Sequence, residues 1–274
     1  MSEIIYLRFI WNGSSTYIVS DDYKKTLTPG PGEIDIGRFR ITTYPCIGQG
    51  AFGRVCRALD THSGRLVAAK EIQFEENEEI EETCEMMQQI KYLSHIHLVQ
   101  ILDFIVDRNI CWLFMENCEL GDLAAYLKGN HDMSLRKRAT ILYHIASALE
   151  FLHSNDIIHR DVKPQNVLMK RILDQDIAKL GDFDTAKLYT MRTDRHSHYM
   201  CFHTVNKGTV AYNAPELLKE YQEEEIPLYT TTVDVFSLGL LGAVLLDYSE
   251  ENPSLFPVSG KCPFSLVLIF CLKS

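Results

Sequence analysis

The feature that most constrains the fold of this chain is a glycine-rich run, IGQGAFGRV, at residues 47–55. Its pattern, G-x-G-x-x-G-x-V, is shared by dinucleotide-binding sites and by flaps that cover phosphate groups. In a dinucleotide site a helix begins at the last glycine, whereas here the residues after Gly53 continue as a predicted strand, RVCRALD. This context argues against a dinucleotide-dependent oxidoreductase. It predicts a flap between two strands whose backbone N–H groups reach phosphates.

A lysine on the following strand supports this interpretation. The segment THSG predicts a hairpin turn between RVCRALD and RLVAAKEI, and Lys70 lies near the end of the second strand. A single lysine at a strand end is usually a solvated surface residue. Beside a glycine flap, its ammonium group is a point charge suited to the α- and β-phosphates of a nucleotide.

The hydrophobic pattern predicts a β-rich front part and a helical rear part. A segment free of Gly and Pro at 75–93 predicts a helix, and the runs VQILDFIV and ICWLFME predict two strands. Ser134 predicts the N-cap of a one-sided apolar helix, and 233–246 predicts a buried helix. We therefore expect an N-terminal extension at 1–33, a β-rich lobe at 34–118 and a helical lobe at 119–274.

Composition restricts the class of protein. The chain has 274 residues, 46% of them hydrophobic, which suits a globular protein with a sizeable core. A formal net charge of −10 argues against nucleic acid as a partner, because its backbone attracts Lys and Arg. Eight cysteines without a C-x-x-C pair, and no secretory segment, predict reduced thiols in an intracellular compartment, the cytoplasm or the nucleus. The apolar run FSLVLIFCL is about half as long as the roughly 20 residues that span a bilayer, so we expect no transmembrane segment.

The strongest catalytic signal is IIHRDVKPQNVLM at residues 157–169, which follows the predicted one-sided helix. The pattern H-R-D-x-K-x-x-N places four polar side chains within eight residues. Asp161 can accept a proton from an incoming hydroxyl, Lys163 can neutralise a phosphoryl group in transfer, and Asn166 can hold a metal ion. This spacing predicts phosphoryl transfer.

With these motifs in order, the sequence resembles the eukaryotic-type serine/threonine protein kinases, with some likeness to the Ste- and NIMA-related groups. The resemblance runs from about Ile41 to Leu246 and includes Asp182, the APE motif that ends at Glu216, and Asp234 in DVFSLG. It implies an α+β, bilobal protein kinase-like fold with a β-rich N-lobe and a helical, incomplete C-lobe. It also implies transfer of the ATP γ-phosphoryl group to serine and threonine hydroxyls of proteins, with Mg²⁺.

The resemblance further implies which residues bind ATP and its metal ions. Met115 would be the gatekeeper, and Glu116 and Cys118 would offer backbone hydrogen bonds to the base. Asn166 and Asp182 would hold Mg²⁺. The complete set of implied ATP-binding residues is Ile47, Gly48, Gly50, Gly53, Val55, Ala68, Lys70, Met115, Glu116, Cys118, Asp122 and Leu168.

The segment KLGDFDTAKL places two aspartates around one phenylalanine. Asp182 matches the metal-binding aspartate of the family's D-F-G motif, and Asp184 stands where the family has glycine. Glycine adopts unusual backbone angles without a Cβ penalty, and aspartate does so less readily. We therefore expect Asp184 to bias this segment toward one conformation without removing the magnesium site.

Other positions depart from the family pattern. The glutamate that pairs with Lys70 falls by position at Met86, so we take the neighbouring Glu85 as the partner. Between Asp182 and the APE motif, Thr204 is the predicted phosphorylation site, and its phosphate would bind Arg160. The run HSHYMCFH in the same segment is interpreted as a polar loop, because its spacing is not that of a closed zinc site.

The end of the chain differs most from the family. About 28 residues follow the helix predicted at 232–247, where the family normally has several more helices. We therefore expect a truncated C-lobe. The alternative function that follows is a kinase-like pseudoenzyme, or a truncated isoform, that acts as a binding or scaffold protein.

Overall fold

A computed structural model describes residues 32–50, 53–74, 77–188, 210–217 and 230–247 of the chain. These residues form two compact units. The first unit holds the described residues up to Glu85 together with Ile101–Asn117, and the second holds Met86–Gln100 together with the described residues from Cys118 onward. Within the described ranges, no helix has the length and apolar character needed to cross a bilayer.

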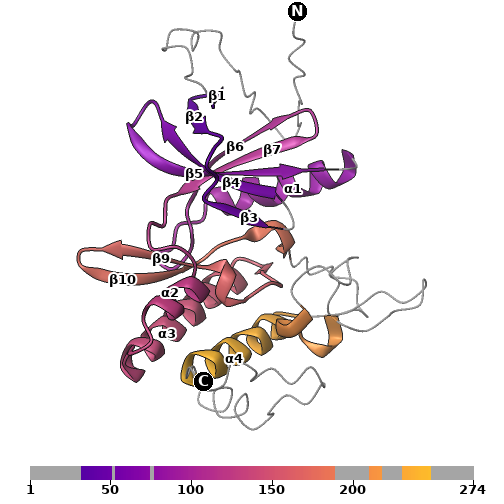
Figure 1. The fold of residues 1–274 in the computed structure, drawn as a ribbon. Helices are drawn as coiled ribbons and strands as arrows, with labels where there is room; N and C mark the ends of the chain where they lie inside the picture. The colour runs from indigo at the N-terminus through magenta and orange to yellow at the C-terminus, as the bar shows by residue number, and fades with distance from the viewer. Residues whose placement is uncertain (1–31, 51–52, 75–76, 189–209, 218–229, 248–274) are drawn as a thin grey trace, which may run out of the picture. The chain divides into compact units, whose positions relative to one another are not determined.

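The first unit is built on one antiparallel sheet (Figure 1). Its strands are β1 (Glu33–Ile36), β2 (Phe39–Thr42), β3 (Gly48–Gly50), β4 (Gly53–Asp60), β5 (Arg65–Gln73), β6 (Ile101–Asp107) and β7 (Ile110–Glu116). They are ordered β1-β2-β4-β5-β7-β6, and β3 pairs with β4. The strand predicted after Gly53 and the predicted hairpin are confirmed, with Asp60 opposite Arg65. Helix α1 (Asn77–Lys91) follows β5 along the chain.

One face of this sheet carries an apolar core. Side chains alternate between the two faces of a strand, so every second residue of β2, β4, β5 and β7 points into it. The rings of Phe39 and Phe114 stack there with their centroids 3.7 Å apart. The buried members of this core are Phe39, Ile41, Cys56, Ala58, Val67, Ala69, Trp112 and Phe114.

Besides the C-terminal part of α1, the second unit contains three α-helices and two small two-stranded sheets among its described residues. The helices are α2 (Leu123–Gly129), α3 (Leu135–His153) and α4 (Thr232–Asp247). Strand β8 (Ile157–Ile158) pairs with β11 (Lys187–Leu188), and β9 (Val167–Ile172) pairs with β10 (Gln175–Leu180). The predicted α+β fold, with a β-rich N-terminal part and a helical C-terminal part, is confirmed. The predicted truncation concerns residues 248–274, which lie outside the described ranges.

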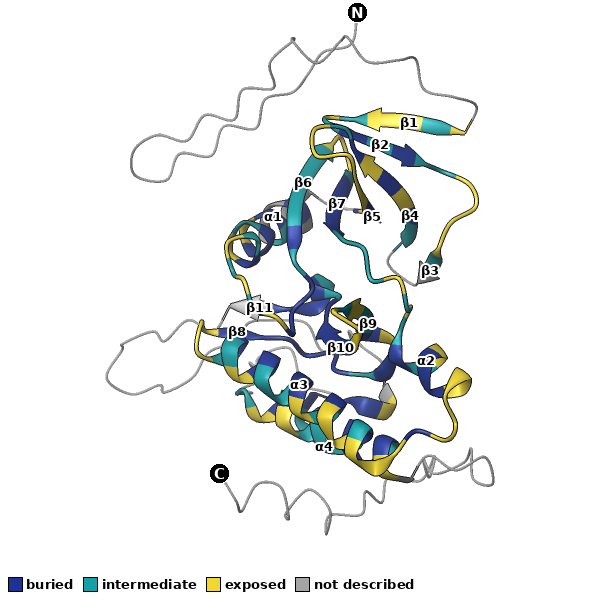
Figure 2. Ribbon diagram, turned by 90° about the vertical axis from the view of Figure 1, so that its left-hand side faces the viewer, coloured by how far each residue is buried: buried dark blue, intermediate teal, exposed yellow. Residues whose placement is uncertain are grey.

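Helix α3 forms where the sequence predicts it. The Ser134 hydroxyl accepts a hydrogen bond from the Lys137 N–H at 3.3 Å, which satisfies one of the unpaired donors of the first turn. Buried and exposed residues alternate around the helix in Figure 2, as expected for a one-sided apolar helix. A hydrogen bond joins α3 to α4. Nη1 of Arg138 on α3 donates to the carbonyl of Leu245 on α4 at 2.9 Å.

Three histidines cluster at α3 in the second unit, where His97 stacks on His144 and meets His95 edge to face. The rings of His97 and His144 lie 4.0 Å apart at their centroids, and His95 meets His97 at 5.5 Å. Nδ1 of His144 accepts a hydrogen bond from the Ala178 N–H at 3.3 Å, and the buried Lys179 ammonium belongs to the same strand. Burial, followed by the charge of His97, lowers the pKa of His144 to about 4. Burial also lowers the pKa values of His95 and His97.

This stack predicts a loss of stability in mild acid. The pKa of His144 is lower in the folded state than the ~6.5 of an unfolded histidine, so its contribution is complete above that pH and is lost as the pH falls toward 4. A shift of this size corresponds to about 3 kcal/mol. His144→Phe keeps an aromatic ring in the stack and should flatten the pH dependence of urea unfolding between pH 6.5 and 4. The exposed His62→Gln is the control, and an equally flat curve for it would refute the assignment.

Candidate active site

The strands of the first unit place the glycine run in line with Lys70. Gly48 of β3 lies opposite Val55 of β4, and Val55 lies opposite Lys70 of β5. Gly50 lies opposite Gly53 at the end of the same ladder. Directly opposed residues of neighbouring strands are about 4.5–5.5 Å apart at Cβ. The flap and the lysine are therefore separated by a single strand.

Four of the predicted ATP-binding residues share one face of this sheet. Ala68 precedes Lys70 by two positions on β5 and therefore points to the same side, and it lies opposite Met115 of β7. Val55 joins them because it is directly opposite Lys70. The other face carries the apolar core around Cys56. The sheet thus gathers small and apolar side chains around one buried ammonium group, a combination suited to a base and its phosphates.

Gly53 fills a position where a side chain has no room. Its φ is 141°, and a Cβ added there would lie 1.7 Å from the carbonyl oxygen of Glu71 on β5. Beside it, Arg54 Nε donates to Oε2 of the buried Glu71 at 2.6 Å, which joins β4 to β5 at this point. The backbone of the last glycine therefore lies so close to the neighbouring strand β5 that no side chain fits between them.

Gly53→Ala is expected to destabilise the first unit by about 2–3 kcal/mol, because the clash and the positive φ both force the backbone to move. Gly64→Ala is the matched control. Gly64 has a φ of 67° but nothing lies within 4 Å of an added Cβ, so only the conformational cost of about 1 kcal/mol applies. Urea unfolding measures both, and equal losses would show that the contact with Glu71 has no effect.

The other predicted residues of this unit lie at its edges. Ile47 is exposed just before β3, and Glu116 is half-buried at the end of β7. On α1, Glu85 is exposed and Met86 is buried, so the residue at the family's glutamate position points into apolar surroundings. Pairing of Lys70 with Glu85 stays a prediction.

In the second unit, the predicted catalytic residues form one hydrogen-bonded group. Lys163 Nζ donates to Oδ2 of Asp161 at 2.6 Å. Nδ2 of Asn166 donates to the same oxygen and to the carbonyl of Asp161, both at 2.8 Å. Asp161 is buried, with 3% of its surface exposed. These charge-assisted bonds fix the orientation of the carboxylate.

A buried aspartate from α4 holds the loop that carries this group. Asp234 is fully buried, and its two carboxylate oxygens accept hydrogen bonds from the N–H of His159 at 2.8 Å and the N–H of Arg160 at 2.7 Å. Oδ2 also lies 2.8 Å from Nε2 of His153 at the end of α3. One side chain therefore fixes two successive peptide groups immediately before Asp161.

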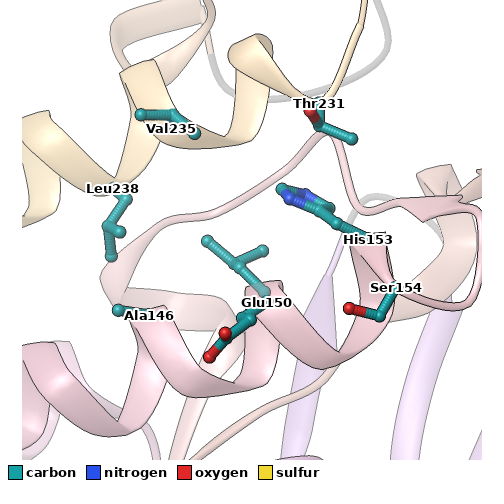
Figure 3. A pocket seen from close by; sticks show the side chains of 8 residues that line it. Ala146, Glu150, His153, Ser154, Thr231, Val235 and Leu238 are labelled. Atoms are coloured by element: carbon teal, nitrogen blue, oxygen red, sulfur yellow. The ribbon is translucent and has the colours of Figure 1, made fainter. Parts of the chain in front are cut away.

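His153 also lines a pocket of about 570 Å³ between α3 and α4. Figure 3 shows its imidazole reaching from α3 toward Thr231, with Val235 and Leu238 along α4 on the opposite side. The pocket contains none of the predicted catalytic or ATP-binding residues.

The loop is also joined to the KLGDFDTAKL segment. Nε2 of His159 lies 2.9 Å from the carbonyl of Gly181, and the Thr185 hydroxyl donates to the carbonyl of His159 at 3.0 Å. Arg160 has a φ of 67°, and its Nε donates to the carbonyl of Thr185. These bonds fix the position of the catalytic loop relative to the segment that carries Asp182.

The strained backbone position in this segment is Asp182 and not Asp184. Asp182 has φ 64° and ψ 74°, in the left-handed region. Asp184 lies within the 3₁₀ turn Phe183–Thr185, and its φ is not among the positive values of the described residues. Asp184 therefore does not adopt the angles that only glycine would allow, and its bias of the segment toward one conformation stays a prediction. An aspartate is tolerated there because the turn does not require glycine.

The donors around Asp182 fit a magnesium ion. The N–H of Gly181 donates to the carbonyl of Asn166 at 2.9 Å. Asp182 follows Gly181 directly, so the bond brings the two predicted metal ligands into the same part of the unit. A carboxylate and an amide oxygen are hard ligands, and Mg²⁺ usually takes one or two of them together with substrate phosphates and water.

The remaining predicted residues of the second unit lie where the chain enters α2. Asp122 and Leu168 form an isolated β-bridge, so they are neighbours. Oδ1 of Asp122 accepts a hydrogen bond from the Ala125 N–H at 2.8 Å, which makes Asp122 the N-cap of α2. The carbonyl of Cys118 accepts a bond from Gly121 at 3.2 Å. Asp122, one of the residues predicted to bind ATP, therefore has a structural role as well.

Comparison with known proteins identifies the family. Residues 41–253 match the family described as protein kinase domain. The chain belongs to this family. The matched range includes the glycine run, Lys70, the Asp161 group, Asp182 and Asp234.

Individual kinases show the same relationship. The chain is 31% identical to mitogen-activated protein kinase 1 of Oryza sativa subsp. japonica over 217 residues, 76% of this chain and 50% of that protein. It is 32% identical to Aurora kinase B of Drosophila melanogaster over 203 residues, 71% of this chain and 55% of that protein. With the Drosophila serine/threonine-protein kinase fused it shares 34% over 207 residues, 74% of this chain and 23% of that protein. The chain therefore spans about half or less of the length of these relatives, all of which support a eukaryotic-type serine/threonine protein kinase. Likeness to the Ste- and NIMA-related groups stays a prediction.

Two sequence predictions for the segment between Asp182 and the APE motif lie outside the described residues. They are the phosphorylation site Thr204 and the run HSHYMCFH. The phosphate-binding role of Arg160 depends on the first of these and is likewise untested.

Sequence reasoning did not find the residues that position the catalytic loop of this kinase. The DVFSLG motif includes Asp234 but does not predict its role, and no sequence pattern points to His153 or Thr185. The available signal was an acidic residue inside an otherwise apolar helix, since a buried carboxylate must find hydrogen-bond donors.

Proposed function

We propose that this chain is an active ATP-dependent protein serine/threonine kinase that uses Mg²⁺. The observation that carries the proposal is the Asp161 group, in which Lys163 and Asn166 both donate to one carboxylate oxygen. We further propose an intracellular, cytoplasmic location.

In this mechanism the chain's own residues orient the nucleotide, neutralise charge on its phosphates and accept one proton. Lys70 binds the α- and β-phosphates, and the face formed by Val55, Ala68 and Met115 receives the adenine. The Asp161 carboxylate accepts the proton of the attacking serine or threonine hydroxyl, and Lys163 neutralises charge on the phosphoryl group. Asn166 and Asp182 would hold a magnesium ion, which when bound would neutralise charge on the phosphates.

The test is transfer of radiolabelled phosphate from ATP to a peptide library, followed by phosphoamino acid analysis. Label on serine and threonine, dependent on magnesium, is the expected result. Label confined to tyrosine would refute the assignment of acceptor.

A second candidate is a kinase-like binding or scaffold protein. It is favoured by α1, where Met86 is buried and Glu85 is exposed, so that the family's lysine–glutamate pair has no acid at its usual position. A ligand that binds only the folded state raises its melting temperature. Stabilisation by Mg-ATP without any transfer would therefore favour the scaffold over the enzyme.

A further inference from the structure

Two cysteines meet at the base of the glycine run. The Sγ atoms of Cys46 and Cys56 are 3.7 Å apart. Cys56 lies on β4 and is fully buried, whereas Cys46 is exposed and directly precedes the paired segment that leads into β3. The backbone between them is already closed, because the N–H of Ile47 donates to the carbonyl of Val55 at 2.8 Å. The two thiols are therefore in contact without any rearrangement of the strands.

We propose that Cys46 and Cys56 are a site of reversible oxidation, at which a disulfide closes the base of the glycine run. A disulfide has an S–S distance of about 2.0 Å, so each sulfur must move by less than about 1 Å. Cys46 lies outside the ladder, so rotation of its side chain does not disturb strand pairing. Intracellular disulfides of this kind are typically transient and redox-sensing.

The oxidant is hydrogen peroxide or another hydroperoxide. The exposed Cys46 thiolate attacks one peroxide oxygen and becomes a sulfenic acid, and the hydroxide released takes up a proton to give water. The sulfur of Cys56 then attacks the sulfenic sulfur, and its thiol proton leaves with the hydroxyl group as a second water. Two electrons pass from the two thiols to one peroxide. Burial raises the pKa of Cys56 to about 11, which agrees with Cys46 as the residue that reacts first.

The disulfide would enclose the whole glycine run while leaving the ATP-binding face open. Residues 47–55 lie between the two cysteines and include Gly48, Gly50 and Gly53. Cys56 lies opposite Ala69 and points into the core, whereas its neighbour Val55 lies opposite Lys70 on the other face. The cross-link would tie the start of the glycine run to β4 and so prevent the run from adjusting to a bound nucleotide. Oxidation should therefore weaken ATP binding, a consequence that rests on the proposed function.

Peptide mapping tests the disulfide directly. Trypsin cuts after Arg40, Arg54 and Arg57, so Cys46 and Cys56 fall on separate peptides, 41–54 and 55–57. The full chain is treated with hydrogen peroxide, alkylated without reductant and digested. We expect a cross-linked pair of these peptides, two hydrogen atoms lighter than their sum and lost on reduction. Recovery of both peptides alkylated, or of peptide 41–54 joined to any other cysteine, would overturn the proposal.

Matched variants separate the disulfide from general oxidation. Cys46→Ser alters an exposed side chain and should fold normally but give no cross-link. Cys111→Ala removes another buried thiol of the same sheet and should leave the cross-link intact. If peptide 55–57 of the Cys46→Ser variant is recovered in equal yield as a disulfide with another cysteine peptide, Cys56 pairs elsewhere and the proposal is overturned.

Nucleotide binding separates this inference from the proposed function. In the wild type we expect the apparent Kd of Mg-ATP to rise about tenfold on oxidation, which is ~1.4 kcal/mol, and to recover with dithiothreitol. Cys46→Ser should show no change. If ATP does not bind the reduced protein, the proposed function fails while the peptide map still decides the disulfide. If ATP binds and the map shows no cross-link, only the disulfide fails.

Discussion

Asp161→Asn should lower phosphoryl transfer by about 10²–10⁴-fold, the range that a positioned general base contributes. The asparagine cannot accept the proton of the incoming hydroxyl. It also replaces the carboxylate that receives hydrogen bonds from Lys163 at 2.6 Å and from Asn166 at 2.8 Å. The loss should appear in kcat, with the KM for ATP changed much less, because the phosphates are assigned to Lys70 in the other unit.

Asp156→Asn is the matched control, since it makes the same chemical change five residues earlier. Asp156 is exposed and has a φ of 57°, an angle that asparagine also adopts. Transfer by this variant should equal that of the wild type. If Asp161→Asn keeps more than about a tenth of the wild-type rate, Asp161 is not the base and the mechanism is wrong.

Asp234→Ala should destabilise the second unit by about 3–5 kcal/mol, because each buried N–H left without an acceptor costs about 1–3 kcal/mol. The carboxylate accepts from the N–H groups of His159 and Arg160 and contacts His153, and Asp234 itself is fully buried. Arg160 is also held at a φ of 67°, and this strained angle loses its support. Urea unfolding followed by circular dichroism measures the loss.

Two further variants make this result specific. Asp234→Asn keeps one acceptor oxygen but turns an NH₂ group toward a backbone N–H, so its loss should be intermediate. Val235→Ala changes the next residue of α4, which is exposed, and should lie within about 0.5 kcal/mol of the wild type. A loss below about 1 kcal/mol for Asp234→Ala would show that the loop keeps its geometry without the carboxylate.

The sequence by itself determined the features that depend on neighbours in the chain. The strand after Gly53 decided between a phosphate flap and a dinucleotide site, and the H-R-D-x-K-x-x-N spacing brought Lys163 and Asn166 to Asp161. The cap at Ser134 and the buried face of α3 also followed from local pattern. In each case the interacting residues lie within a few positions of one another, so periodicity and spacing carry the information.

Tertiary structure alone decided the contacts between distant segments. Asp234 reaches the N–H of His159 across 75 positions, the histidine cluster joins residues from two distant segments, and Cys56 meets Cys46 only because β3 folds back on β4. Asp182 has a positive φ next to Gly181, whose backbone bonds to Asn166 and His159, two residues far from it in the sequence. No local propensity encodes such contacts, because their energy comes from packing and from hydrogen bonds that form only when the segments are already adjacent.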